Sequence, residues 1–438
     1  MTSLSASRFK RLAPSLFFAA FLSVAGCTTT SPGPVGPISS GKPRVDPSND
    51  TGPLDPSTDV VEEDLGELED EYSAPVDYTP PHLADRDDLV RAGVMLPFSD
   101  RRASVRTQTE GMLAAIELAL FDSVGDNFII LPKDTRGSQA TAAQVAEELV
   151  VNGADIVLGP LFGANIPAVR DITAYEGIPI VSFSNDSSVA GGGAWLASIA
   201  PEVEVAEIIK YAALQGYEDF AFFGPQSALG QKVERAMQIE VAQNGGRMIA
   251  SGFYPSDSVN PNFEAEYFAG SVAAAAETGR RVAVLVPERG NRLRRIAPLL
   301  AYHGVDTRVV RMLGISGWND PSVWREPSLN GAWFTAPPQL EMNDFSSRYA
   351  RQYGQEPTSL AALAYDAAAL AMALGRDGDL TMEELTNPDG FAGVNGLFRF
   401  RSDGTLERSL AIMEIDPRDE TGVREVRPVA ASFIEQVG

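Results

Sequence analysis

The polar residues best placed to bind a ligand directly follow four predicted strands of the chain. Their hydroxyl, amide and carboxylate groups can donate and accept hydrogen bonds, and open α/β sheets bind ligands beyond the carboxyl ends of their strands. The same residue types commonly form turns and helix N-caps, so a purely structural role is the alternative at every position. The candidates are Ser99 and Asp100, then Asn165 with its apolar neighbour Phe162, then Ser184, Asn185 and Asp186, and finally Ser227.

The residue inventory gives little support to catalysis. The sequence has two histidines, His82 and His303, and their separation does not match the spacing of metal ligands. It contains no Gly-x-Ser-x-Gly nucleophile motif, and its one cysteine lies at the end of an apolar leader. The triple glycine 191–193 lacks the lysine of a phosphate-binding loop. We therefore expect a binding protein that is not an enzyme and needs no metal or cofactor.

The cysteine, Cys27, has the surroundings of a lipid attachment site. Three basic residues precede an apolar stretch over 12–24, which is too short for a permanent membrane span and is typical of a cleaved signal. Residues 24–27 then read Val-Ala-Gly-Cys, which resembles the bacterial lipobox. This order predicts a signal peptide over 1–26 and a diacylglycerol on the Cys27 thiol. Several acyl chains would hold the protein stably on a membrane.

A strongly acidic chain follows the anchor. The formal net charge is -24, so we expect no nucleic-acid partner, because phosphate binding needs a basic face. Residues 27–88 are rich in proline, glycine and carboxylates, with few large apolar residues. Such a segment cannot bury enough surface to offset its ordering entropy, and like charges extend it. The sequence predicts a disordered tether over 27–88 that lets the body work at a distance from its anchor.

Strands alternating with helices of ten to fifteen residues characterise the body, which predicts βαβ units and parallel sheets. The pattern occurs twice, which indicates a second α/β unit of similar size. Two late strands, 396–400 and 408–415, are predicted to form a hairpin through the turn 402–404. The predicted division is lobe 1 over 89–203, lobe 2 over 204–335, and a last segment over 336–438 that completes both lobes.

An ordered set of motifs over 89–417 resembles type 1 periplasmic binding proteins, the leucine/isoleucine/valine-binding group. The set comprises the strand at 93–97, the Gly-Pro-Leu turn at 159–161, the strand at 177–182, Ala-Tyr-Asp-Ala at 364–367, and Phe-Arg-Phe at 398–400. The resemblance implies two Rossmann-like lobes joined by three crossing segments, with a ligand cleft between them. It also adds Tyr365 to the candidate cleft residues.

The loops that hold amino acids in that group are altered here. Residues 162–165 read Phe-Gly-Ala-Asn and offer no hydroxyl, and Leu229-Gly230 replaces the usual tyrosine-glycine pair. A buried zwitterion needs such polar partners. The stretch 182–186 is similar instead to penicillin-binding protein activators, which are lipoproteins that dock on a bifunctional peptidoglycan synthase. Thr28 occupies the place of the aspartate that retains lipoproteins in the inner membrane, which favours the outer membrane.

Two functions therefore stay open. The first hypothesis is a periplasmic, lipid-anchored and non-catalytic protein that binds and stimulates a bifunctional penicillin-binding protein. The alternative is the solute-binding receptor of an ABC transporter, with a small polar or amino-acid-like ligand. A polar cleft that takes a ligand between the lobes would favour the receptor, and an exposed docking patch beside a filled cleft would favour the activator.

Overall fold

A computed structural model describes residues 79, 83, 86–123, 127–376 and 380–433. The predicted signal peptide, Cys27 and nearly all of the predicted tether lie outside the described residues, so those expectations stay predictions. Among the helices that are described, none is both long and apolar enough to cross a membrane.

The first lobe, lobe 1, is built on a five-stranded parallel sheet with the strand order β2-β1-β3-β4-β5. Helices connect successive strands, and their apolar residues cover the sheet because a parallel sheet is buried on both faces. The strands are β1 (Val90–Leu96), β2 (Phe128–Asp134), β3 (Ile156–Leu158), β4 (Ile180–Ser182) and β5 (Ala194–Leu196), and the helices are α1 (Ala103–Asp122), α2 (Gln139–Val151) and α3 (Ile166–Thr173).

Late segments of the chain complete lobe 1. The alanine-rich α9 packs against α1 within one apolar core that also contains β1 and β3. Small side chains allow this close approach of two helices. The late elements are α8 (Gln339–Tyr353), α9 (Ala361–Arg376), α10 (Met382–Leu385) and a small antiparallel sheet of β11 (Phe391–Gly393), β12 (Gly396–Phe400) and β13 (Leu406–Arg408).

The second lobe, lobe 2, has a seven-stranded sheet with the order β15-β14-β10-β9-β8-β6-β7. Strands β6 to β10 are parallel, and β14 runs antiparallel to β10. Lobe 2 has two apolar cores. Helices α4 and α5 pack in one core, and helices α6 and α7 pack in the other. The strands are β6 (Asp219–Gln226), β7 (Arg247–Pro255), β8 (Val282–Leu285), β9 (Arg311–Gly314), β10 (Trp333–Ala336), β14 (Ala411–Ile415) and β15 (Val423–Arg427), and the helices are α4 (Pro201–Leu214), α5 (Ala228–Gln243), α6 (Asn262–Glu277) and α7 (Gly290–Tyr302).

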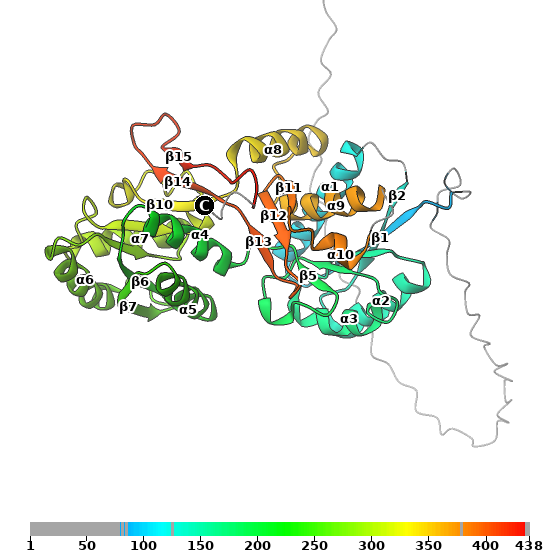
Figure 1. Cartoon of the computed structure of the whole chain (residues 1–438), viewed down its shortest axis with the longest axis horizontal. Coiled ribbons are helices and arrows are strands. Elements are labelled where there is room, and N and C mark those ends of the chain that lie inside the picture. Colours follow the sequence, from blue (N-terminus) through cyan, green and yellow to red (C-terminus); the bar gives the residue numbers. More distant parts are fainter. Residues whose placement is uncertain (1–78, 80–82, 84–85, 124–126, 377–379, 434–438) are drawn as a thin grey trace, which may run out of the picture. The chain divides into compact units, whose positions relative to one another are not determined.

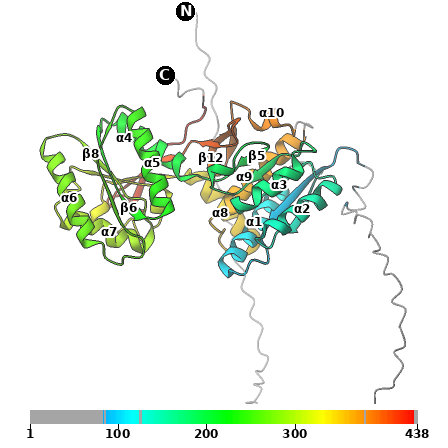
Figure 2. The ribbon, with the colours of Figure 1, turned by 90° about the horizontal axis from the view of Figure 1, so that it is seen from below.

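The chain passes between the two lobes three times, after β5, after β10 and after β13 (Figures 1 and 2). This arrangement confirms the predicted α/β fold of two lobes with parallel sheets. The predicted hairpin between 396–400 and 408–415 is wrong in its second strand. Only β13 pairs with β12, and the chain then crosses to lobe 2, where β14 pairs with β10 and β15. One continuous segment of the sequence thus serves two sheets.

Candidate ligand-binding site

The loops at the carboxyl ends of the strands in lobe 1 begin at tightly fitted turns. Gly159 follows β3 with a φ of +114°, a conformation that favours glycine. A Cβ atom at this position would lie 2.3 Å from the carbonyl oxygen of Met95 at the end of β1. A side chain there is therefore excluded, and the turn directs the chain from β3 into the loop that contains Phe162 and Asn165.

Two predicted candidates, Asp100 and Phe162, meet Arg102, which was not predicted, beside β1. Asp100 is buried and accepts hydrogen bonds from the backbone N–H, Nε and Nη2 of Arg102 at 2.8–2.9 Å. These bonds lower the pKa of Asp100 to about 2. The exposed Arg102 guanidinium lies 5.0 Å above the ring of Phe162. Gly137 closes the group, because a Cβ there would lie 2.8 Å from Asp100 Oδ2 and 3.1 Å from Phe162.

A second group of candidates meets beside β4. A Cβ on Gly163 would lie 2.8 Å from Ser184 Oγ and 3.2 Å from the Cβ of Asp186, so the two loops are in contact. Ser184 Oγ accepts a bond from the Asp186 N–H at 3.1 Å. Asp186 in turn accepts bonds from the side chain and backbone of Ser188, which lower its pKa. Asn165 is 2% exposed, and its Nδ2 has no partner among the described residues.

The remaining lobe 1 candidates are held by neighbours. Ser99 is exposed and donates its hydroxyl proton to Asp134 Oδ2 at 2.5 Å. The backbone carbonyl of Asn185 accepts a hydrogen bond from Lys232 Nζ of α5 at 2.9 Å, and Lys232 also pairs with Glu202 of α4 at 2.9 Å. The loop that carries the Ser184 group is therefore bonded to lobe 2 in this structure.

In lobe 2, the predicted candidate Ser227 is a helix N-cap, which was the structural alternative to a role in ligand binding. Its Oγ accepts a hydrogen bond from the Gly230 N–H at 3.1 Å and caps the N-terminus of α5. This bond uses one of the hydroxyl's acceptor positions, while the hydroxyl proton remains able to bond elsewhere.

Two buried carboxylates near the strand ends of lobe 2 were not predicted. The Tyr254 hydroxyl donates to Glu288 Oε1 at 2.6 Å, and Arg292 Nε lies 2.9 Å from the same oxygen. Burial raises the pKa of Tyr254. Glu204, in the first turn of α4, accepts bonds from the Ser316 N–H at 2.6 Å and the Thr335 hydroxyl at 3.1 Å. The one sequence signal for Glu288 was its position three residues after the apolar strand β8.

Tyr365 lies apart from the other candidates. Its hydroxyl donates to Asp122 at 2.9 Å and accepts from Arg348 at 3.2 Å. Asp122 ends α1, whereas the Asp100 group lies at the start of that helix, and a helix of 20 residues is about 30 Å long. Tyr365 therefore joins α1, α8 and α9 on the side of lobe 1 away from the strand ends. The resemblance assigned it to the cleft without any local signal for its direction.

Its neighbour Asp366 binds the small sheet instead. Asp366 is 3% exposed and accepts hydrogen bonds from the Val394 N–H at 2.7 Å and from the Asn395 side chain at 2.9 Å. Arg408 Nη1 lies 3.4 Å from Asp366 Oδ2. A Cβ on Gly393 would lie 2.5 Å from the carboxylate, so the β11–β12 turn closes directly over it.

Exposed arginines gather at the strand ends of an otherwise acidic protein. Arg101, Arg102 and Arg136 belong to loops that follow β1 and β2, and Arg289 follows β8 at the start of α7. Within the described residues, Arg101, Arg136 and Arg289 have no ion-pair partner. Helices α1, α2 and α7 also begin at these loops, and helix N-termini favour negative charge. The arrangement can attract and bind an anion.

The fold and the strand-end loops define a two-lobed binding protein. The sequence profile of the periplasmic binding protein family matches residues 90–422, and the chain belongs to this family. The resemblance to type 1 periplasmic binding proteins is therefore confirmed. No curated protein matches the chain. The family comprises solute-binding proteins rather than enzymes, and membership implies a periplasmic location.

Three solved structures illustrate the likeness. A putative branched-chain amino acid ABC transporter protein from Rhodospirillum rubrum is 19% identical, with a TM-score of 0.67 over 77% of this chain and 100% of that one. A solute-binding protein from Rhodopseudomonas palustris, in complex with 3,4-dihydroxybenzoic acid, is 17% identical over 79% and 98%, with a TM-score of 0.52. A substrate-binding protein from Streptococcus pneumoniae, in complex with isoleucine, is 17% identical over 78% and 100%, with a TM-score of 0.51.

Proposed function

We propose that the body is a solute receptor that binds a small organic anion between its lobes. The observation that carries this proposal is the set of exposed arginines at the strand ends of a chain whose net charge is -24. Arginine presents a planar fork of donors that matches a carboxylate. The two similar proteins in complexes also support it, because isoleucine and dihydroxybenzoic acid each carry a carboxylate.

Calorimetry of the purified protein with benzoate and leucine tests the proposal. We expect one or both to bind, and Arg101→Gln, at an exposed arginine without an ion-pair partner among the described residues, to weaken the binding about tenfold, the effect of losing roughly 1.4 kcal/mol. Arg351→Gln, an exposed arginine near the end of α8, is the matched control and should leave the affinity unchanged. If no small carboxylate binds at millimolar concentration, or if both variants behave alike, the anion receptor is wrong.

The penicillin-binding protein activator is the second candidate. Several strand-end groups form bonds within their own loops, as Asp100, Asp186 and Ser227 do, and such a surface offers fewer free groups to a small ligand. An activator would act by docking on its synthase instead. A pull-down of the protein with the bifunctional penicillin-binding proteins of its organism, joined to a glycan-polymerisation assay, separates the two functions. Stimulation would establish the activator, and no interaction would exclude it.

The lipid anchor at Cys27 and residence in the outer membrane remain part of the proposal. Metabolic labelling with palmitate should mark the protein, and Cys27→Ser should abolish the label. Membrane fractionation then distinguishes the outer from the inner membrane, and recovery in the inner membrane would remove the argument drawn from Thr28.

A further inference from the structure

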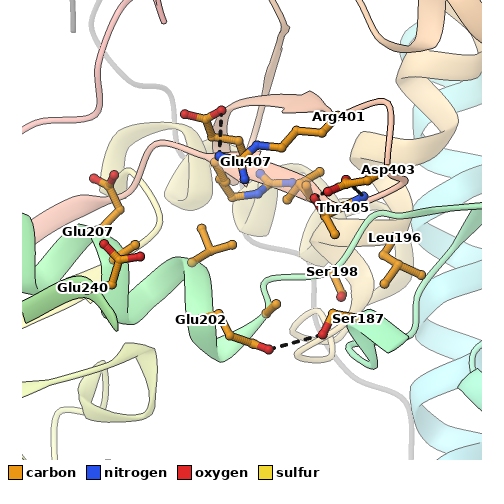
Figure 3. Close-up of a pocket in the computed structure, with 15 residues that line it drawn as sticks. Ser187, Leu196, Ser198, Glu202, Glu207, Glu240, Arg401, Asp403, Thr405 and Glu407 are labelled. Atoms are coloured by element: carbon orange, nitrogen blue, oxygen red, sulfur yellow. Dashed lines mark hydrogen bonds and ion pairs between the residues drawn. The ribbon is translucent and has the colours of Figure 1, made fainter. Parts of the chain in front are cut away.

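A pocket of about 390 Å³ lies apart from the strand-end loops (Figure 3). Its lining comes from α4 and α5 of lobe 2, from β5 and the loop before it in lobe 1, and from β13 and the turn that precedes it. None of the candidate residues from Ser99 to Tyr365 lines it. Its volume falls within the range of small-molecule sites in proteins.

The charges in this pocket are only partly matched by the protein itself. Five carboxylates and two guanidiniums line it. Glu207 pairs with Arg427, and Glu407 pairs with Arg401. Glu240 is half-buried and has no ion-pair partner within the described residues, and burial raises the pKa of its carboxyl group. The charges of Arg401 and Lys210 oppose this rise without forming an ion pair with Glu240, so its carboxylate remains open to a donor from a ligand.

Glu202 adds a second acceptor. Its Oε1 atom pairs with Lys232 at 2.9 Å and accepts a bond from the Ser187 hydroxyl at 3.3 Å. Its Oε2 atom is buried and has no hydrogen-bond partner among the described residues. Figure 3 shows Glu202 directed toward Ser187, whereas Glu240 lies beside Glu207 in another part of the pocket. A protonated amine is the group that a carboxylate of this kind accepts.

The pocket lining also contains a buried hydrogen-bond donor without an acceptor, on Arg408 at the end of β13. Arg408 lines the pocket, and its side chain is only 1% exposed. Its Nη1 atom faces Asp366, but its Nε–H has no acceptor in the described structure. A buried donor without an acceptor costs free energy, which an oxygen atom of a ligand would recover. This donor is an observation independent of the carboxylates.

We propose that this pocket is a second ligand site, for a small molecule that carries a protonated amine and an oxygen acceptor several atoms away. The amine binds to Glu240, and the acceptor bonds to Arg408. Because Arg408 belongs to β13, which completes lobe 1, and Glu240 belongs to α5 of lobe 2, the bound molecule contacts both lobes.

Calorimetry with three six-carbon probes tests this site in the purified protein. We expect 6-aminohexanoate to bind, and hexylamine and hexanoate, which each lack one of its two charged groups, to bind about tenfold more weakly. Glu240→Gln should weaken the binding of 6-aminohexanoate by a similar factor, because it removes the charge without enlarging the pocket. Glu266→Gln, on the exposed surface of α6, is the matched control.

Several results would overturn the assignment. Equal affinities of Glu240→Gln and the unaltered protein would place the amine elsewhere, and equal affinities of 6-aminohexanoate and hexylamine would remove the role of Arg408. Absence of binding by all three probes at millimolar concentration would reject the site. Because 6-aminohexanoate also carries a carboxylate, the titrations are repeated with excess benzoate, which competes for the strand-end anion site. Binding that persists and is weakened by Glu240→Gln belongs to this pocket, so failure of one site is distinguishable from failure of the other.

Discussion

Two buried carboxylates, one in each lobe, solve the same physical problem in different ways. Asp366 in lobe 1 lies opposite a buried cation, Arg408, and accepts hydrogen bonds from the β11–β12 turn. Glu204 in lobe 2 has two neutral donors, the Ser316 N–H and the Thr335 hydroxyl. Burial raises the pKa of both carboxyl groups, and only at Asp366 does a buried cation oppose that rise.

The difference teaches how strongly each position depends on its charge. Removing one member of a buried ion pair leaves the other charge without compensation, whereas removing an acceptor of neutral bonds leaves only unsatisfied dipoles. The two carboxylates also hold different structures. Asp366 fixes the turn beside the third crossing between the lobes, and Glu204 fastens the start of α4 to the strand ends of lobe 2.

The largest expected effect comes from Asp366→Ala. The substitution leaves the Arg408 guanidinium, two backbone N–H groups and the Asn395 side-chain amide without their acceptor in the core, and we expect it to lower the free energy of unfolding by about 3–5 kcal/mol. Urea denaturation followed by circular dichroism measures the change. Asp389→Ala, at an exposed aspartate near the same sheet, is the control and should have little effect. A loss below about 1 kcal/mol at Asp366 would show that the pair is not a buried constraint.

Glu204 should distinguish charge from shape. Glu204→Ala leaves two donors without an acceptor, and we expect it to cost about 1–3 kcal/mol. Glu204→Gln keeps an oxygen for the Ser316 N–H and the Thr335 hydroxyl and should cost less. The same denaturation experiment compares them. If Glu204→Gln lowers the free energy of unfolding as much as Glu204→Ala, the charge itself is required, and the contrast with Asp366 fails.

The pH dependence sharpens this contrast further. The folded pKa of Glu204 lies above the ordinary value of about 4.5. The protonated form therefore contributes stability that is complete below pH 4.5 and is lost as the pH rises through the folded pKa. Glu204→Gln cannot ionise, so its stability relative to the unaltered protein should increase from pH 4 to pH 7. A constant difference across that range would contradict the raised pKa.

The smallest expected effect concerns the ion pair between the buried Asp100 and the exposed Arg102. Arg102 holds the pKa of Asp100 at about 2, below the ordinary 3.8, but the guanidinium is exposed and its contribution is screened by solvent. The contribution of Asp100 is present above pH 3.8 and is lost as the pH falls towards 2. Thermal unfolding of Asp100→Asn should therefore resemble that of the unaltered protein at low pH and differ slightly at pH 7.

Local patterns sufficed for most of the fold, because strands such as Val282–Leu285 are continuously apolar and alternate with helical segments. The loops after β1, β3 and β4 were also predictable, since strand ends of a parallel sheet share one edge. Asp100, Phe162, Ser184 and Asp186 are each in contact with another of these loops.

Residues brought together by distant segments were not predictable. Arg408 and Asp366 are separated by 42 positions, and nothing near either residue indicates the other. Tyr365 was assigned by resemblance alone, and its direction depends on the packing of α9 against α1 and α8. The break between β13 and β14 was missed for the same reason, because the partners of the two strands lie in different sheets far away in the sequence.

The three crossings between the lobes determine the order in which the two lobes can fold while the chain is synthesised. The core of lobe 1 combines residues 90–197 with residues 345–406, whereas lobe 2 draws its cores from 205–336 and the late strands. A growing chain therefore exposes the apolar faces of β1 and α1 until α9 has emerged. Such contacts between remote segments form slowly, and the unpaired surface is prone to aggregation in the meantime. Lobe 2 can collapse on its parallel strands first and act as the platform on which lobe 1 closes.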